Sequence, residues 1–88
     1  MSAAFYTPGE LSAIGGSVNA AVAARFTPAR SWAVPWQSDT GHLYAVSRAG
    51  YACAPLTAHG NTPQALLADI FQVEADAARS RRRTERAA

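Results

Sequence analysis

The candidate groups for chemistry in this chain are a single cysteine, Cys53, and two histidines, His42 and His59. A thiol and an imidazole form a nucleophile–base pair when they lie within hydrogen-bond reach. Nothing beside Cys53 in the sequence would activate its thiol, and no glycine-rich oxyanion loop accompanies it. We therefore expect a partly buried strand cysteine, a strand histidine at 42 and a loop histidine at 59, with no enzyme activity, metal site or cofactor.

Asp39-Thr40-Gly41 matches the aspartic-protease tripeptide. That family precedes the tripeptide with hydrophobic strand residues and follows it with alanine or serine, whereas here Ser38 precedes it and His42 follows. An Asx-type residue followed closely by glycine is typical of a tight turn. The sequence therefore predicts a turn at 38–41 and no catalytic aspartate.

The aromatic residues of the middle stretch are the stronger candidates for a site. Tryptophan, tyrosine and arginine are the residue types that most often anchor protein interfaces. The alternative, that these side chains pack a small core, stays open at this point. The residues predicted to bind a protein partner are Trp32, Trp36, Tyr44, Arg48 and Tyr51.

Charge is distributed unevenly along the chain, whose formal net charge is +2. Residues 79–88 hold five arginines and one glutamate, whereas residues 1–78 hold three arginines and five carboxylates. An arginine run is either a solvated terminus or a phosphate-binding segment with salt-sensitive affinity. The candidates for nucleic-acid contact are Arg79, Arg81, Arg82, Arg83 and Arg86.

These residues need elements to position them, and the first element is a helix. Thr7, Pro8 and Glu10 form a capping box with proline at the first helical position, and Thr27-Pro28 ends the helix. Gly15 and Gly16 interrupt it, and Gly16, Ala20 and Ala24 leave one face nearly bare. That face predicts close packing on the sheet or the second helix, or contact with a second copy of the chain.

The middle stretch changes to a period of two residues. Trp32, Val34 and Trp36 alternate and predict a strand with all three on one face, while Pro35 indicates an edge strand or a bulge. A second strand is expected over 42–48, a tight turn at Ala49-Gly50, and a third strand over Tyr51–Leu56.

A second helix is predicted from a cap at Asn61 or Thr62, with Pro63 in its first turn and fraying near 81–83. Its apolar stripe is Leu66, Leu67, Ile70, Phe71, Val73 and Ala77. The fold class is therefore α+β, a single small α-β-β-β-α domain with a three-stranded antiparallel sheet packed against two helices. Residues 1–78 would form this domain, and residues 79–88 a flexible arginine-rich tail.

At 88 residues the chain buries only about 60–65% of its unfolded surface, so a homodimer is one expectation. One cysteine excludes an internal disulfide and suits a reducing cytoplasm. No apolar run approaches the length of a membrane span, and the N-terminus lacks the pattern of a signal peptide.

Two family resemblances follow from this order of elements. The α–β–β–β–α order is similar to that of double-stranded-RNA-binding domains, although the expected second helix starts without their basic residues. The run from Trp32 to Phe71 resembles HicB-type antitoxins through Tyr51-Ala52-Cys53 and Gly60-Asn61-Thr62, although their Pro-Asp-Leu-Pro-Gly stretch is absent. These resemblances imply nucleic-acid binding or antitoxin activity.

The function that the sequence favours is a small non-enzymatic regulator or inhibitor, typical of phage- or plasmid-encoded accessory proteins. We expect it to bind a host protein or ribonucleoprotein complex through an aromatic sheet surface, with electrostatic help from the arginine tail. The alternative is a nucleic-acid-binding regulator or HicB-like antitoxin.

Overall fold

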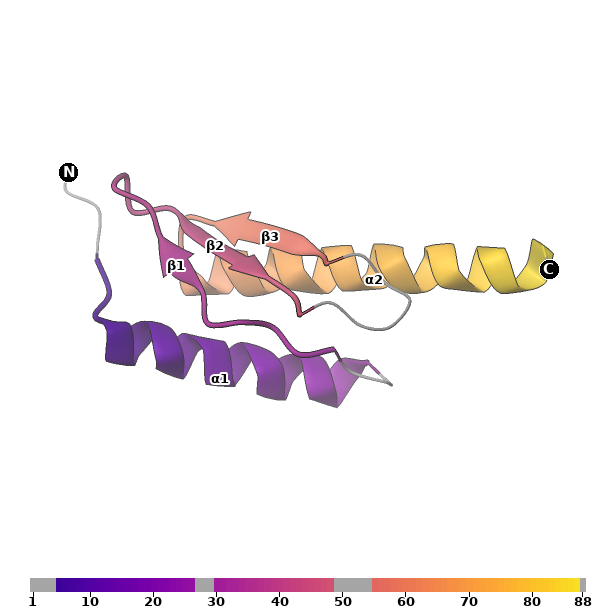
Figure 1. Cartoon of the computed structure of the whole chain (residues 1–88), viewed down its shortest axis with the longest axis horizontal. Coiled ribbons are helices and arrows are strands. Elements are labelled where there is room, and N and C mark those ends of the chain that lie inside the picture. The colour runs from indigo at the N-terminus through magenta and orange to yellow at the C-terminus, as the bar shows by residue number, and fades with distance from the viewer. Residues whose placement is uncertain (1–4, 27–29, 49–54, 88) are drawn as a thin grey trace.

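The computed structural model describes residues 5–26, 30–48 and 55–87, with 81–87 described as backbone. The elements in chain order are α1 (Pro8–Arg25), β1 (Trp36–Gln37), β2 (Leu43–Val46), β3 (Thr57–Gly60) and α2 (Pro63–Ala87) (Figure 1). The three strands form one antiparallel sheet in the order β1-β2-β3. The predicted α+β fold is confirmed.

Helix α1 begins where the sequence predicts. The Glu10 backbone N–H donates to Thr7 Oγ1 at 3.1 Å, and the Thr7 backbone N–H donates to Glu10 Oε1 at 2.9 Å. Two otherwise unpaired donors of the first turn are thereby satisfied, which fixes the start of the helix.

Helix α2 begins with Thr62 as its cap, since the Ala65 backbone N–H donates to Thr62 Oγ1 at 3.0 Å. The helix continues to Ala87 instead of ending near Arg81 as expected, and its C-terminal part projects past the sheet (Figure 1). This projection gives the molecule its extents of 51 × 21 × 20 Å. The predicted mobility of 79–88 stays a prediction. Neither helix has, over the described residues, an apolar stretch long enough to cross a bilayer.

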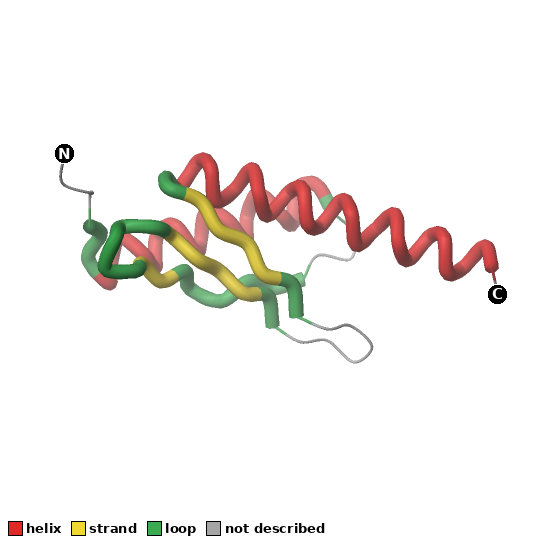
Figure 2. Tube along the Cα trace, turned by 90° about the horizontal axis from the view of Figure 1, so that it is seen from above, coloured by secondary structure: helices red, strands yellow, loops and turns green. Residues whose placement is uncertain are grey.

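The core lies between the inner face of the sheet and the two helices. The strands present buried side chains at alternate positions toward it, and both helices add apolar residues. Its fully buried members are Val18, Val22, Trp32, Leu43, Ala45, Ala58, Leu66 and Ile70. In Figure 2 no helix crosses in front of the strands, which leaves the other face of the sheet uncovered.

The first strand contains a one-residue offset. Trp36 pairs with Tyr44, and Trp32 pairs with Ser47. Trp32 and Trp36 are four residues apart, whereas Tyr44 and Ser47 are three residues apart. The first strand therefore holds one extra residue, as in a β-bulge, at the place where Pro35 has no backbone N–H to donate. Because side chains alternate between faces, this offset turns Trp32 and Trp36 to opposite faces.

The expectation that Trp32, Val34 and Trp36 share one strand face is therefore wrong. Trp32 is 2% exposed and packs in the core, whereas Trp36 is 54% exposed. The predicted bulge at Pro35 explains why Trp32 and Trp36 differ in exposure.

The third strand also differs from its predicted position. β3 spans Thr57–Gly60, and its register pairs Val46 with Thr57 and Leu43 with Gly60. Of the residues expected to form this strand and its tight turn, 49–54 lie outside the described residues, and 55–56 are not in a strand. The Ser47 backbone N–H donates to the Leu56 carbonyl at 2.9 Å, which extends the contact between the two segments by one position beyond the Val46–Thr57 pair.

Two glycines allow close approach between elements. A Cβ on Gly60 would lie 2.4 Å from the Leu66 backbone N, so β3 packs directly on the first turns of α2. A Cβ on Gly15 would lie 3.3 Å from Pro35 Cδ, so α1 packs against the offset segment of the first strand. Gly16 has no neighbour within 4 Å, and Ala20 and Ala24 are exposed, so the expectation that this small-residue face packs on the sheet or on α2 is wrong. Its contact with a second copy of the chain stays a prediction.

Trp32 is held by polar contacts from both helices. Its indole Nε1 donates to Glu74 Oε2 at 3.3 Å, and Glu74 Oε1 pairs with Arg30 Nε at 2.7 Å. On the other side, the Asn19 side chain accepts from the Trp32 backbone N–H at 2.8 Å and donates to its carbonyl at 2.9 Å. The residue thereby joins α1, the sheet and α2.

Replacing Gly60 with alanine tests the contact between β3 and α2. The added methyl group overlaps backbone atoms of Ala65 and Leu66, which cannot move without shifting α2, so Gly60→Ala is expected to cost about 2–3 kcal/mol. Urea unfolding measures this. The matched control is Gly16→Ala, where open space and helix propensity predict a gain of up to about 1 kcal/mol. Equal effects of the two substitutions would contradict the close contact at Gly60.

Replacing Glu74 with alanine tests the polar anchor of Trp32. It leaves the indole N–H and the largely buried Arg30 without their partner, and the expected loss is about 2–3 kcal/mol of unfolding free energy. Asp76→Ala is the control, because Asp76 pairs with Arg79 at the exposed surface and should change stability by less than about 0.5 kcal/mol. A loss at Glu74 no larger than the control's would exclude a structural role for the anchor.

Candidate functional site

The uncovered side of the sheet carries a cluster of ring side chains, which we call the aromatic face and define as Trp36, His42, Tyr44 and His59. Trp36, Tyr44 and His59 sit opposite one another on β1, β2 and β3, and His42 immediately precedes β2. Directly opposed residues of adjacent strands project to the same side of the sheet. The sheet register therefore brings together rings that are far apart in the sequence.

Trp36 and Tyr44 form the flat part of the aromatic face. Their ring centroids are 4.5 Å apart and the ring planes meet at 18°, which is a stacked arrangement. Such pairs are worth about 0.5–1.5 kcal/mol beyond the area they bury. The stack holds the Trp36 ring in place although more than half of that residue is exposed to solvent.

His42 and His59 form the polar part. His42 Nε2 lies 2.8 Å from His59 Nδ1, and His42 Nδ1 lies 2.5 Å from Asn61 Oδ1. The His42 ring centroid is 4.9 Å from that of Tyr44, and the His59 centroid is 6.2 Å from it. The two imidazoles, which the sequence treated as a strand residue and a loop residue, therefore form one hydrogen-bonded pair.

Neighbouring contacts keep this part of the sheet rigid. β3 is an edge strand, and its His59 backbone N–H donates to Asp69 Oδ2 of α2 at 2.9 Å. This contact satisfies a donor at the edge of the sheet. At the other end the Gly41 backbone N–H donates to the Ser38 carbonyl at 2.9 Å, and Gly41 has a φ of 87°. The predicted turn at 38–41 is confirmed, and the Asp39 side chain is exposed in it.

The predicted protein-binding residues are divided by the fold. Trp36 and Tyr44 lie on the aromatic face, and Arg48 is exposed beyond the end of β2. Trp32 is buried among core residues, so it is not available to a partner. Tyr51 lies outside the described residues, as does Cys53.

The arginine segment lies away from the aromatic face. Arg79 is exposed on α2 and pairs with Asp76, and the helix continues through residues 81–87. In Figure 1 the C-terminal end of α2 and the β1–β2 turn lie at opposite ends of the long axis. The two predicted binding regions are therefore spatially separate.

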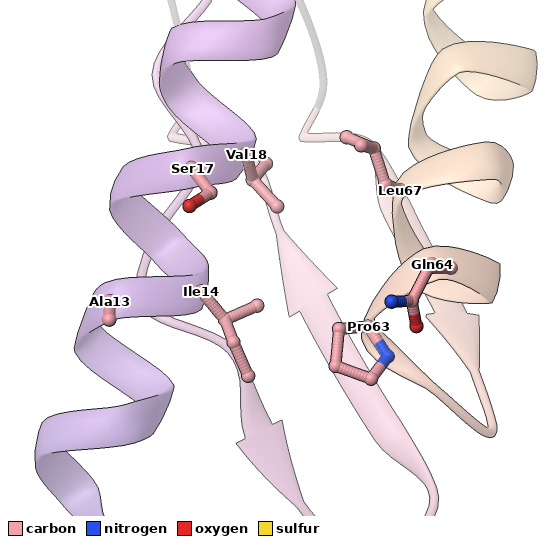
Figure 3. Close-up of a pocket in the computed structure, with 7 residues that line it drawn as sticks. All are labelled: Ala13, Ile14, Ser17, Val18, Pro63, Gln64 and Leu67. Carbon is pink, nitrogen blue, oxygen red and sulfur yellow. The ribbon is translucent and has the colours of Figure 1, made fainter.

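A second surface feature is a groove of about 290 Å³ between the N-terminal parts of the helices (Figure 3). Its lining comes from α1 and α2: Ala13, Ile14, Ser17, Val18, Pro63, Gln64 and Leu67. None of these described residues is ionisable. The groove thus offers mainly apolar contact, with Ser17 and Gln64 as its polar side chains.

The aromatic face has little formal charge. The outward positions of β1–β3 hold Trp36, Tyr44, Val46, Thr57 and His59, with no lysine, arginine or carboxylate among them. Within the described ranges no group of three or more histidine, cysteine, aspartate or glutamate residues could hold a metal ion. The face is therefore equipped for contact through ring surfaces and hydrogen bonds.

Sequence reasoning missed His42, His59 and Asn61 as one cluster. The cause is the position of the third strand, because a strand over 51–56 leaves His59 in a loop. The usable signal was the alternation of Thr57, Ala58, His59 and Gly60, whose small residues at 58 and 60 suit the inner face beneath α2. Placing the strand there brings His59 opposite Tyr44.

Comparisons with known proteins found no family model, curated protein or solved structure that matches the chain.

Proposed function

We propose that this chain is a small non-enzymatic regulatory or inhibitory protein that binds a protein partner through the aromatic face. The observation that carries the proposal is Trp36, which is 54% exposed, stacked on Tyr44 and placed on a sheet face that neither helix covers. A large aromatic residue held rigid at the surface gives contact area at a small entropic cost.

The composition of the aromatic face supports a protein partner over a nucleic acid. Surfaces that stack bases combine aromatic rings with a positively charged groove along the backbone. Here the outward strand positions lack cations, and the half-exposed aliphatic Val46 continues the apolar surface beside Tyr44. An apolar, aromatic patch with a polar rim fits the desolvated centre of a protein interface.

The arginine segment would act on association rates. It lies at the far end of the molecule from the aromatic face, so it does not enter the same contact area. Its five arginines would attract an acidic partner over a range limited by salt screening.

Replacing Trp36 with alanine should abolish partner binding while leaving the fold intact. Truncating a central interface tryptophan commonly costs 2 kcal/mol or more, which is about thirtyfold in affinity. The measurement is affinity capture from lysate at low and high salt with nuclease treatment, followed by titration of the captured protein against each variant. Circular dichroism checks the fold.

Val34→Ala is the matched control, because this valine is as exposed as Trp36 but lies against α1 at Gly15. Binding should survive in this variant and be lost in Trp36→Ala and Tyr44→Ala. A captured protein that binds all three variants equally would exclude the aromatic face as the contact surface.

A second candidate function is nucleic-acid binding through the C-terminal part of α2. The observation in its favour is that the helix continues past the sheet to Ala87 and carries the arginine-rich sequence with it. Removing residues 79–88 should then abolish the retention of nucleic acid, whereas Trp36→Ala should not. The check is a gel-shift titration between 50 and 200 mM salt, where phosphate contacts predict a steep loss of affinity. Nucleic acid retained by the truncated chain would contradict this candidate.

A further inference from the structure

We infer that His42 and His59 form a two-histidine site for a divalent late transition-metal ion, with Cu²⁺ and Ni²⁺ preferred to Zn²⁺. The inference rests on the facing imidazole nitrogens, 2.8 Å apart on neighbouring strand positions of the sheet. It is independent of the partner proposed above. Imidazole is a ligand suited to copper, nickel and zinc.

The hydrogen bond to Asn61 determines which His42 nitrogen is available. Asn61 Oδ1 is an acceptor, so His42 Nδ1, 2.5 Å away, must carry the proton. A neutral His42 then has its lone pair on Nε2, the atom that faces His59 Nδ1. Metal-binding histidines characteristically donate their other ring N–H to an oxygen in this way, which fixes the ring and its tautomer.

The spacing of the two nitrogens fits one ion. Two nitrogens about 2.0 Å from a metal lie about 2.8 Å apart at a 90° angle, as in a square-planar site, and about 3.3 Å apart in a tetrahedral one. The observed separation of 2.8 Å matches the first geometry. The ring centroids are 5.0 Å apart, so the two nitrogens face each other almost head-on, and each ring must turn by about 45° to direct its lone pair at an ion beside the N···N line. The ion then replaces the proton on His59 Nδ1, and His59 stays neutral with its proton on Nε2.

The backbone around the site is held before any ion arrives. His59 is in β3, where Asp69 accepts its backbone N–H, and His42 follows the 38–41 turn, where its own N–H donates to Ser38 Oγ at 3.2 Å. Because the described residues supply no third ligand of this kind, water or a partner group completes the coordination shell. The site is therefore open, and its affinity is expected to be modest.

The test uses the full chain without a purification tag, in a Cys53→Ser background that removes the competing thiol. The chain holds only two histidines, so imidazole coordination reports this pair alone. Titration with CuCl₂ and with NiCl₂ by calorimetry should give one ion per chain, and MgCl₂ should give no saturable binding. Electron paramagnetic resonance of the Cu²⁺ complex should show two coordinated imidazole nitrogens. Cu²⁺ should also quench Trp36 fluorescence, since Trp36 stacks on the Tyr44 ring beside His42.

Variants separate the site from adventitious binding. His42→Gln and His59→Gln should each raise the dissociation constant at least tenfold, and Asn61→Ala should raise it about tenfold through loss of ring orientation. The control is Asp39→Asn, an exposed carboxylate in the adjacent turn, which should leave metal affinity unchanged. The inference is overturned if the double histidine variant binds Cu²⁺ as tightly as the parent, or if the parent shows no saturable binding up to 1 mM metal. Neither result would bear on the partner binding tested with Trp36→Ala.

Discussion

The structure depends on one extra residue in its first strand. Between the Trp32–Ser47 pair and the Trp36–Tyr44 pair, the first strand advances four residues while β2 advances three. A strand without this offset would send both tryptophans to one face. Both indoles would then lie either on the uncovered face or in the core. Pro35, which cannot donate to the ladder, lies in the offset segment, and Gly15 of α1 lets the helix pack against it.

The offset buries one tryptophan in the core and leaves the other exposed on the sheet surface. Trp32, on the inner face, joins the sheet to both helices through Asn19 of α1 and Glu74 of α2. In a domain this small a single large buried side chain contributes a sizeable part of the core, and its one polar atom must find a partner. The buried Glu74 serves that need and is itself neutralised by Arg30. Trp36, on the outer face, is left to stack on Tyr44 in contact with solvent.

The aromatic face and the arginine segment make the molecule asymmetric along its long axis. One end presents stacked rings and a histidine pair on a rigid sheet, and the other presents a basic helix that extends beyond the core. Contact through the aromatic face would depend on ring surface and its desolvation, and contact through the arginine segment would depend on charge that salt screens. These interactions respond differently to salt, so the two ends can be distinguished experimentally. A metal ion at the histidine pair would add a third type of interaction at the first end.

The sequence by itself determined the features that depend on local chemistry. The capping box at Thr7 and Glu10, the turn at Gly41 and the order of elements follow from short-range rules and are confirmed. The sequence placed the cap of α2 at Asn61 or Thr62, and the structure has Thr62. Tertiary structure decided what depends on strand register: the position of β3, the burial of Trp32, and the meeting of His42 with His59. The physical reason is the two-residue period of a strand, in which an offset of one residue reverses every side chain, so small local signals cannot fix which face a residue occupies.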